Sequence, residues 1–165
     1  FRHPEIETTE QVFKVLRTQV DVVSPTGSNK TNLQPEIILP IGAAILNAED
    51  PMQVQMATLC QGEVIYISCD PGLTIIDIHR REGTGPTLRK RAVTVRNWEI
   101  LLIDGFTETL LIRLDDLQAK TGNYPVETAF LLAGIGAGWA LNMSPELIRT
   151  GLIAFLQNQA KQSSV

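Results

Sequence analysis

Cysteine and long apolar runs are scarce in this chain of 165 residues, and their scarcity excludes several classes of protein. The two cysteines, Cys60 and Cys69, are too few for the disulfide framework of a small secreted domain. No apolar run approaches the roughly 20 residues that a membrane-spanning helix needs. No charged-then-apolar leader opens the chain. We therefore expect reduced thiols, a cytoplasmic protein and no membrane partner.

An excess of positive charge is also lacking. The formal net charge is -4, which gives no general attraction to nucleic acid, so no nucleic-acid partner is expected. The length suits one domain covering residues 1–165, and the 44% hydrophobic content suffices for a single core.

The familiar signatures of catalysis are missing as well. The chain contains no Gly-x-x-x-x-Gly-Lys-Ser/Thr phosphate loop and no Gly-x-Ser-x-Gly nucleophile motif. The glycines of residues 134–138 fall within a predicted helix, which favours helix packing over nucleotide binding. His3 and His79 are far apart and have no neighbouring ligand types, so no metal site is predicted. We assign no catalytic residue.

The pattern of what is present predicts an α/β fold. A helix is expected from Thr8, followed by a long loop over residues 24–40. Residues 43–46 and 64–67 are short apolar runs typical of buried strands. Between them, Asp50 can cap a helix that has Pro51 at its first position. A strand, helix, strand sequence predicts that the two strands are parallel neighbours.

Residues 73–114 are interpreted as a mostly antiparallel β extension, with a hairpin turn at Asp104-Gly105. Trp98 within it is expected in the core or at its rim. A basic cluster flanks a glycine turn, and it fits either a solvated hairpin or a patch for an anionic partner. Its members are Arg80, Arg81, Arg89, Lys90 and Arg91.

Two helices are predicted to close the chain. The first covers residues 125–141, and its many small residues indicate close packing against the sheet. The second begins at the cap Ser144-Pro145. Residues 157–165 form a polar tail that we expect to be flexible.

The segment Asn47-Ala48-Glu49-Asp50-Pro51 is the most informative one. It follows a buried strand and precedes a helix, at the edge of a parallel sheet where ligands gather. The Asn47 amide can both donate a hydrogen bond to the edge of a nucleotide base and accept one from it. By itself the segment fits either a helix cap or a ligand site.

The residues from Gly42 to Pro51 resemble the Gly-x-Ala-Val-Leu-Asn-Ala-Asp-Asp-Pro stretch of Mur ligases. Upstream, residues 6–10 and 22–27 are similar as well. Downstream and in the same order, the similar pieces are residues 56–57, Cys60, Gly62 and residues 64–68, 112–116, 121–122, 126–127, 139–141 and 144–152. The similarity covers nearly the whole chain except residues 28–41, which look like a loop insertion. The resemblance implies the later part of a three-layer, ATP-binding central domain with parallel strands, an antiparallel extension and two C-terminal helices.

Mur ligases join a carboxylate to an amine through an acyl phosphate, using ATP, magnesium, a phosphate loop and a C-terminal domain. The resemblance implies that Asn47, Glu49 and Asp50 lie on the adenine side of the nucleotide site. Thr128 stands where the family usually has a second asparagine, and Glu49 replaces an aspartate. ATP and magnesium serve the intact family, and neither is expected to bind tightly to this chain.

Two hypotheses follow. The chain is a portion of an ATP-dependent ligase, inactive alone, whose partners are the remaining ligase domains or a second copy of the chain. The alternative is a stand-alone, non-catalytic module for interaction or scaffolding.

Overall fold

The computed structural model describes residues 22–23, 42–85, 87–121 and 128–162. The helix predicted from Thr8, the loop over residues 24–40 and the start of the helix predicted from residue 125 lie outside these ranges. Everything below concerns the described residues.

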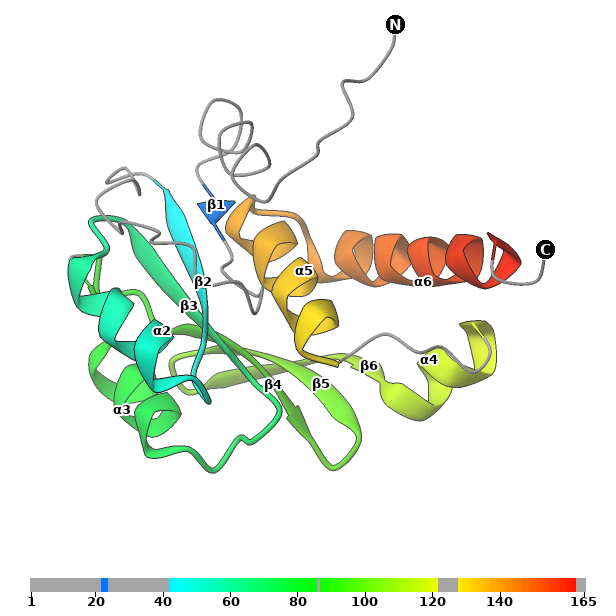
Figure 1. Cartoon of the computed structure of the whole chain (residues 1–165). Helices are drawn as coiled ribbons and strands as arrows, with labels where there is room; N and C mark the ends of the chain where they lie inside the picture. The colour runs from blue at the N-terminus through cyan, green and yellow to red at the C-terminus, as the bar shows by residue number, and fades with distance from the viewer. Residues whose placement is uncertain (1–21, 24–41, 86, 122–127, 163–165) are drawn as a thin grey trace, which may run out of the picture.

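A six-stranded sheet forms the centre of the molecule, with its strands in the order β1 to β6 (Figure 1). Strands β1 to β4 are parallel neighbours, and β5 and β6 continue the sheet antiparallel. The predicted parallel pairing of β2 with β3 is confirmed, with Ile45 opposite Ile65. The strands are β1 (Val22–Val23), β2 (Ala43–Asn47), β3 (Glu63–Ser68), β4 (Arg91–Arg96), β5 (Glu99–Asp104) and β6 (Thr107–Arg113).

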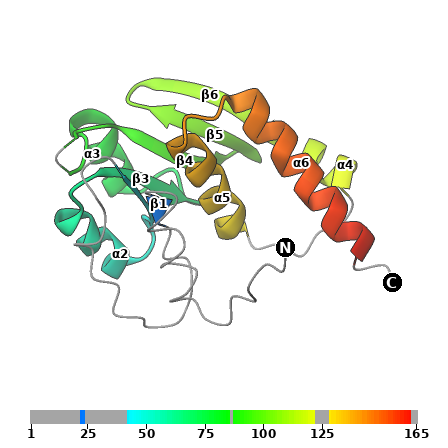
Figure 2. The same ribbon diagram turned by 90° about the horizontal axis from the view of Figure 1, so that it is seen from above.

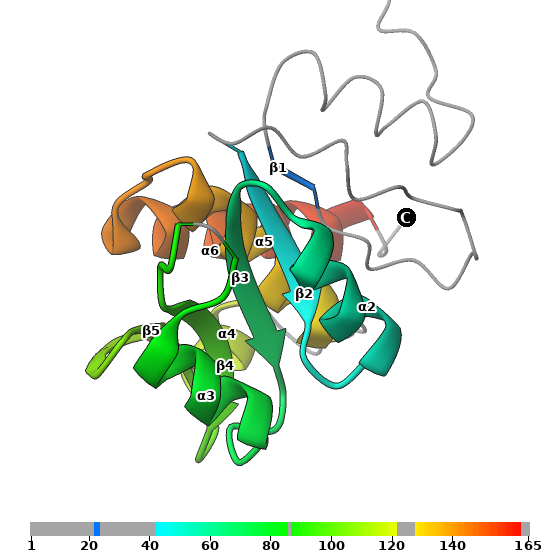
Figure 3. The same cartoon turned by 90° about the vertical axis from the view of Figure 1, so that its left-hand side faces the viewer.

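Helices cover both faces of this sheet, which gives three layers (Figures 1 and 3). One face carries α2 (Pro51–Met56), the short 3-10 helix η2 (Ala57–Leu59) and α3 (Thr74–Glu82). The other carries α5 (Thr128–Ala140) and α6 (Pro145–Gln162). Ile45 packs in the core on the α5 side, and its neighbours Ala44 and Leu46 pack on the α2 side. This alternation is the period of a strand buried on both faces, and the predicted α/β class is confirmed.

The interpretation of residues 73–82 as part of an antiparallel extension is wrong. They form α3, and β4 then pairs parallel with β3. Ile76 and His79, three residues apart, both face the core, which is the period of a helix. The apolar run of residues 73–78 is too short for the spacing of its apolar residues to distinguish a helix from a strand. Only β5 and β6 are antiparallel additions, and the predicted turn at Asp104-Gly105 lies between them.

Small residues bring α5 close to the sheet, as predicted. A Cβ placed on Gly136 would lie only 3.2 Å from Cγ2 of Ile45 and 3.6 Å from Cγ2 of Ile67. Glycine therefore lets the helix backbone approach the strands, which offsets its low helix propensity.

The last helix begins as predicted and continues further. Ser144 Oγ accepts a hydrogen bond from Leu147 N, and Pro145 is the first residue of α6. The helix then runs to Gln162, through most of the segment predicted as a tail. Leu156, the residue just before this segment, is 1% exposed in the core and anchors α6 at that point. Beside α6 lies α4 (Leu114–Thr121), which the sequence did not predict (Figure 2).

Candidate functional site

A cavity of about 520 Å³ opens at the carboxyl ends of β3 and β4. Four segments meet there: the loop after β3, the β4–β5 hairpin, the start of α4 and the start of α5. In parallel α/β sheets this edge is where ligands usually bind. We call this cavity the cleft. Its lining residues are Cys69, Pro71, Val95, Arg96, Asn97, Trp98, Leu114 and Thr128.

Glu49 shapes one wall of the cleft without lining it. Its Oε1 accepts hydrogen bonds from Cys69 N at 2.5 Å, Ser68 Oγ at 3.0 Å and Asp70 N at 3.3 Å. A carboxylate that receives backbone N–H donors holds a loop firmly. Glu49 therefore links the turn after β2 to the loop after β3, and so fixes the position of Cys69.

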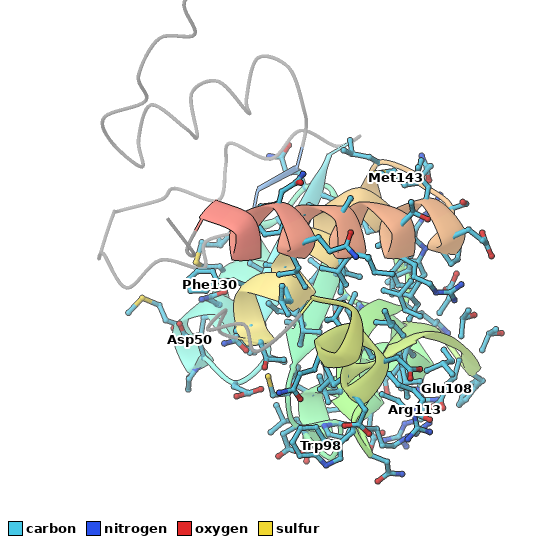
Figure 4. All side chains as sticks on the ribbon, turned by 90° about the vertical axis from the view of Figure 1, so that its right-hand side faces the viewer. Asp50, Trp98, Glu108, Arg113, Phe130 and Met143 are labelled. Atoms are coloured by element: carbon cyan, nitrogen blue, oxygen red, sulfur yellow. The ribbon has the colours of Figure 1, made fainter. Side chains whose placement is uncertain are left out.

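The β4–β5 hairpin supplies another part of the cleft lining. Its two turn residues, Asn97 and Trp98, have φ angles of 52° and 63°. Both angles lie in the left-handed region, as in the tight turns that join hairpin strands. Leu114 N donates to Trp98 O at 2.8 Å, which ties the turn to the start of α4. Trp98 is 68% exposed, so the structure places it at the rim rather than in the core (Figure 4).

The four residues predicted for a nucleotide site divide into two groups. Asn47 is the last residue of β2, and Glu49 and Asp50 lie in the turn between β2 and α2. Thr128 is the first residue of α5 and the only one of the four among the described residues lining the cleft. Glu49 bonds to Cys69 N, and Cys69 lines the same cleft as Thr128.

Two of these side chains already have partners in the turn. Asp50 caps α2, since its Oδ1 accepts from Met52 N at 2.9 Å and its Oδ2 from Gln53 Nε2 at 3.2 Å. The helix-cap interpretation of Asp50 is therefore confirmed. Asn47 Oδ1 accepts from Glu49 N at 2.9 Å. The carbonyl end of the Asn47 amide thus stabilises the turn.

Sequence reasoning did not assign Arg96, Asn97 and Trp98 to the site. The signal that could have found them is the pair Asn97-Trp98 between two strands. Such a turn favours Asn-Gly, and a tryptophan in place of glycine is unusual there.

The charge of Arg96 is neutralised at the cleft. Its guanidinium bonds to the Glu108 carboxylate on β6, which also contacts Arg80 at 2.9 Å. The hydrogen bond from Arg96 lowers the pKa of Glu108 below its usual range. Arg96 is the one cation among the described residues lining the cleft. The cleft therefore offers apolar surface and a few polar groups rather than an unpaired positive charge.

The basic cluster does not form a solvated hairpin. Arg80 and Arg81 belong to the last turn of α3, and Arg91 is buried at the start of β4. Arg91 bonds both carboxylate oxygens of Glu63 and donates to Trp139 O at 2.7 Å. That interpretation is wrong because the segment that follows residue 73 is a helix.

A second cavity of about 690 Å³ lies between α5 and α6. Phe130, Leu147 and Phe155 border it and are 48%, 54% and 51% exposed. Figure 4 labels Phe130 near the start of α5 and Met143 in the connection to α6. We call it the apolar groove. Its lining residues are Phe130, Leu131, Gly134, Ile135, Gly138, Met143, Leu147, Ile148, Gly151, Leu152 and Phe155.

Within the described ranges, no group of three or more His, Cys, Asp or Glu side chains is placed to hold a metal ion. No helix in the same ranges combines the length and apolar character needed to cross a membrane.

The fold and the cleft define an α/β protein with a cavity at the carboxyl edge of its parallel strands. No protein-family model matches the chain. It is 29% identical over 154 residues to a cyanophycin synthetase of Synechocystis sp., which covers 92% of this chain. It is 31% identical over 122 residues, 73% of this chain, to a cyanophycin synthetase of Crocosphaera subtropica. The matched stretches are 15% and 13% of those two relatives, and the similarity supports kinship with a ligase family.

Proposed function

We propose that this chain is a portion of an ATP-dependent ligase of the Mur type that joins a carboxylate to an amine. In this proposal the cleft receives the adenosine end of ATP. The observation that carries it concerns Glu49. This residue belongs to the segment by which the chain resembles Mur ligases, and its carboxylate also holds the loop that lines the cleft. The similarity to two cyanophycin synthetases supports the ligase class.

The dimensions and chemistry of the cleft suit a nucleoside. Its volume of about 520 Å³ lies within the range typical of small-ligand sites. Trp98, Val95 and Leu114 supply apolar surface, while Thr128 and Asn97 supply polar groups. ATP in the intact ligase activates the carboxylate, and its phosphates need a loop and magnesium that other parts of the ligase would supply.

The affinity of the isolated chain for nucleotides follows from this proposal. Because Arg96 is paired with Glu108, the cleft adds no unpaired cation for the triphosphate. Binding should be weak, on the order of millimolar, which corresponds to about 4 kcal/mol. Adenosine and ATP should bind the isolated chain with affinities that agree within a few-fold, and the chain alone should not hydrolyse ATP.

The two cysteines make a direct assay possible. Burial raises the pKa of the Cys60 thiol and shields it, whereas Cys69 is exposed on the cleft. A thiol reagent should therefore modify Cys69 first, and adenosine should slow that modification. Thr128→Ala should weaken the protection, and Thr150→Ala on α6 is a matched control. Absence of protection by adenosine, or a hundredfold preference for ATP, would contradict the proposal.

The apolar groove favours a second candidate function, a non-catalytic interaction module. Under the ligase proposal, the groove packs against the rest of the ligase. The reason is that the related stretches are only 15% and 13% of the two cyanophycin synthetases. The isolated chain should then be a monomer by light scattering. The second candidate would be favoured if the chain formed a stable dimer and Leu147→Glu dissociated it. It would also be favoured if the full gene product lacked a Gly-Lys-Thr phosphate loop.

A further inference from the structure

Trp98 occupies a backbone position that favours glycine. Its φ of 63° follows the φ of 52° at Asn97, so both central residues of the hairpin are left-handed. Glycine takes this conformation readily, whereas a residue with a Cβ rarely does. Tryptophan is therefore an unfavourable choice for the turn itself.

Burial does not explain the choice either. The Trp98 side chain is 68% exposed, whereas Tyr66, another large aromatic residue, is 1% exposed in the core. The backbone bond from Leu114 N to Trp98 O ties the turn to α4 and does not depend on the indole. Trp98 is also among the residues that line the cleft.

The neighbours of Trp98 hold the hairpin in position. Arg96, two residues before it, is bonded to Glu108 on β6, and Glu108 also contacts Arg80 on α3. Exposed aromatic rings on such supports commonly bind flat ring systems by stacking. Cys69 and Pro71, which also line the cleft, belong to the loop that Glu49 anchors.

We propose that Trp98 is the stacking wall of the cleft and makes it selective for a flat nitrogen heterocycle, such as the base of a nucleotide. This inference rests on the proposed function and adds a specificity-determining residue to it. Trp98 contacts the ring face, while the polar groups of Thr128 and Asn97 are available to its edge. Recognition then depends on the base and not on the phosphates.

The test uses AMP and ribose 5-phosphate, which differ only by the base, as probes of Cys69 protection. The wild-type chain should be protected by AMP and not by ribose 5-phosphate. Trp98→Gly should weaken AMP protection roughly tenfold, since stacking on one aromatic side chain commonly has an effect of that size. Trp98→Phe, which keeps a ring, should retain AMP protection within about threefold of the wild type.

The same variants distinguish stacking from a structural role. Because Asn-Gly suits this turn, Trp98→Gly should unfold in urea at the same or a higher midpoint than the wild type. A lower midpoint would overturn the inference. Full protection of Trp98→Gly by AMP would also overturn the inference. Equal protection of the wild type by ribose 5-phosphate and AMP would overturn it too. Neither of these two results contradicts the proposed function. Failure of AMP and adenosine to protect the wild type would overturn both proposals.

Discussion

Arg91 at the start of β4 and Glu63 at the start of β3 form a buried ion pair, with Arg91 Nε 2.6 Å from Glu63 Oε1. Their side chains are 6% and 10% exposed, and the guanidinium lies 5.0 Å from the ring centre of Trp139. The pair therefore joins two parallel strands to the end of α5. It lies at the amino ends of the strands, opposite the edge that carries the cleft.

Removing one partner of this pair should strongly destabilise the fold. Arg91→Met leaves the Glu63 carboxylate buried without its cation and should lower the free energy of unfolding by about 3–5 kcal/mol. The double variant Arg91→Met/Glu63→Leu should recover much of that loss, because no unpaired charge remains. Urea unfolding of the wild type, Arg91→Met, Glu63→Leu and the double variant forms the cycle. Equal losses in the single and double variants would contradict this account.

His79 should make the stability depend on pH. The ring is 0% exposed, and its Nδ1 and Nε2 lie 2.8 Å from Thr84 Oγ1 and 2.9 Å from Arg91 O. Burial lowers the pKa of His79, and the nearby positive charge of Lys90 lowers it further. The hydrogen bond to Arg91 O and the negative charge of Glu63 act in the opposite direction but are smaller than the effect of burial. As the pH falls through about 6.5, the unfolded chain binds a proton that the folded chain does not. The free energy of unfolding should therefore fall below that pH.

A matched variant isolates this contribution. His79→Gln should be less stable than the wild type at pH 7.5, but its stability should change less between pH 7 and about 5. Glu108, whose pKa is lowered, should lose its contribution only at more acidic pH, through the range below about 4.3. A wild-type stability that is flat from pH 7 to 5 would show that His79 is not held neutral.

Two glycines of α5 should respond to alanine in opposite directions. Gly134 faces open space, with no atom within 4 Å of an added Cβ among the described residues, and Gly134→Ala should stabilise by up to about 1 kcal/mol. Gly136→Ala would place its methyl group 3.2 Å from Ile45 Cγ2 and should destabilise by about 1 kcal/mol or more. Thermal unfolding of the two variants checks the difference. Equal stabilisation by both would contradict the close packing of α5 on β2.

Glu49 should control the loop at the cleft. Glu49→Ala removes the acceptor of Cys69 N, so amide exchange at Cys69 should become faster and reaction of its thiol should accelerate. Asp70→Ala is a control in the same loop, since its side chain accepts from Gly72 N and not from Cys69. Unchanged exchange in Glu49→Ala would mean that the loop is held in another way.

Local chemistry made part of the fold predictable. The cap at Asp50, the proline at the start of α2 and the cap at Ser144 fix helix starts by hydrogen bonds within four residues. The parallel pairing of β2 with β3 follows from the helix between them. Residues 73–82 were not predictable in this way, because their helical period depends on which side chains the core accepts.

The cleft was less accessible to sequence reasoning. Thr128 was assigned because it matches an asparagine position of the Mur ligases. Arg96 and Trp98 line the same cleft but belong to the β4–β5 hairpin, which is distant from Thr128 in the sequence. The role of Glu49 also depends on a tertiary contact, since its partners lie 19 to 21 residues further along the chain. Such contacts arise from sheet order, which no local pattern determines.

The most direct test of the central claim is a map of amide and indole NMR shifts during titration with adenosine. The account predicts saturable shifts at Cys69, Asn97, Thr128 and the Trp98 indole, on the order of millimolar adenosine, and nearly the same map with ATP. Shifts confined to residues 80–91 or to the apolar groove between α5 and α6, or no shift at saturating adenosine, would contradict it.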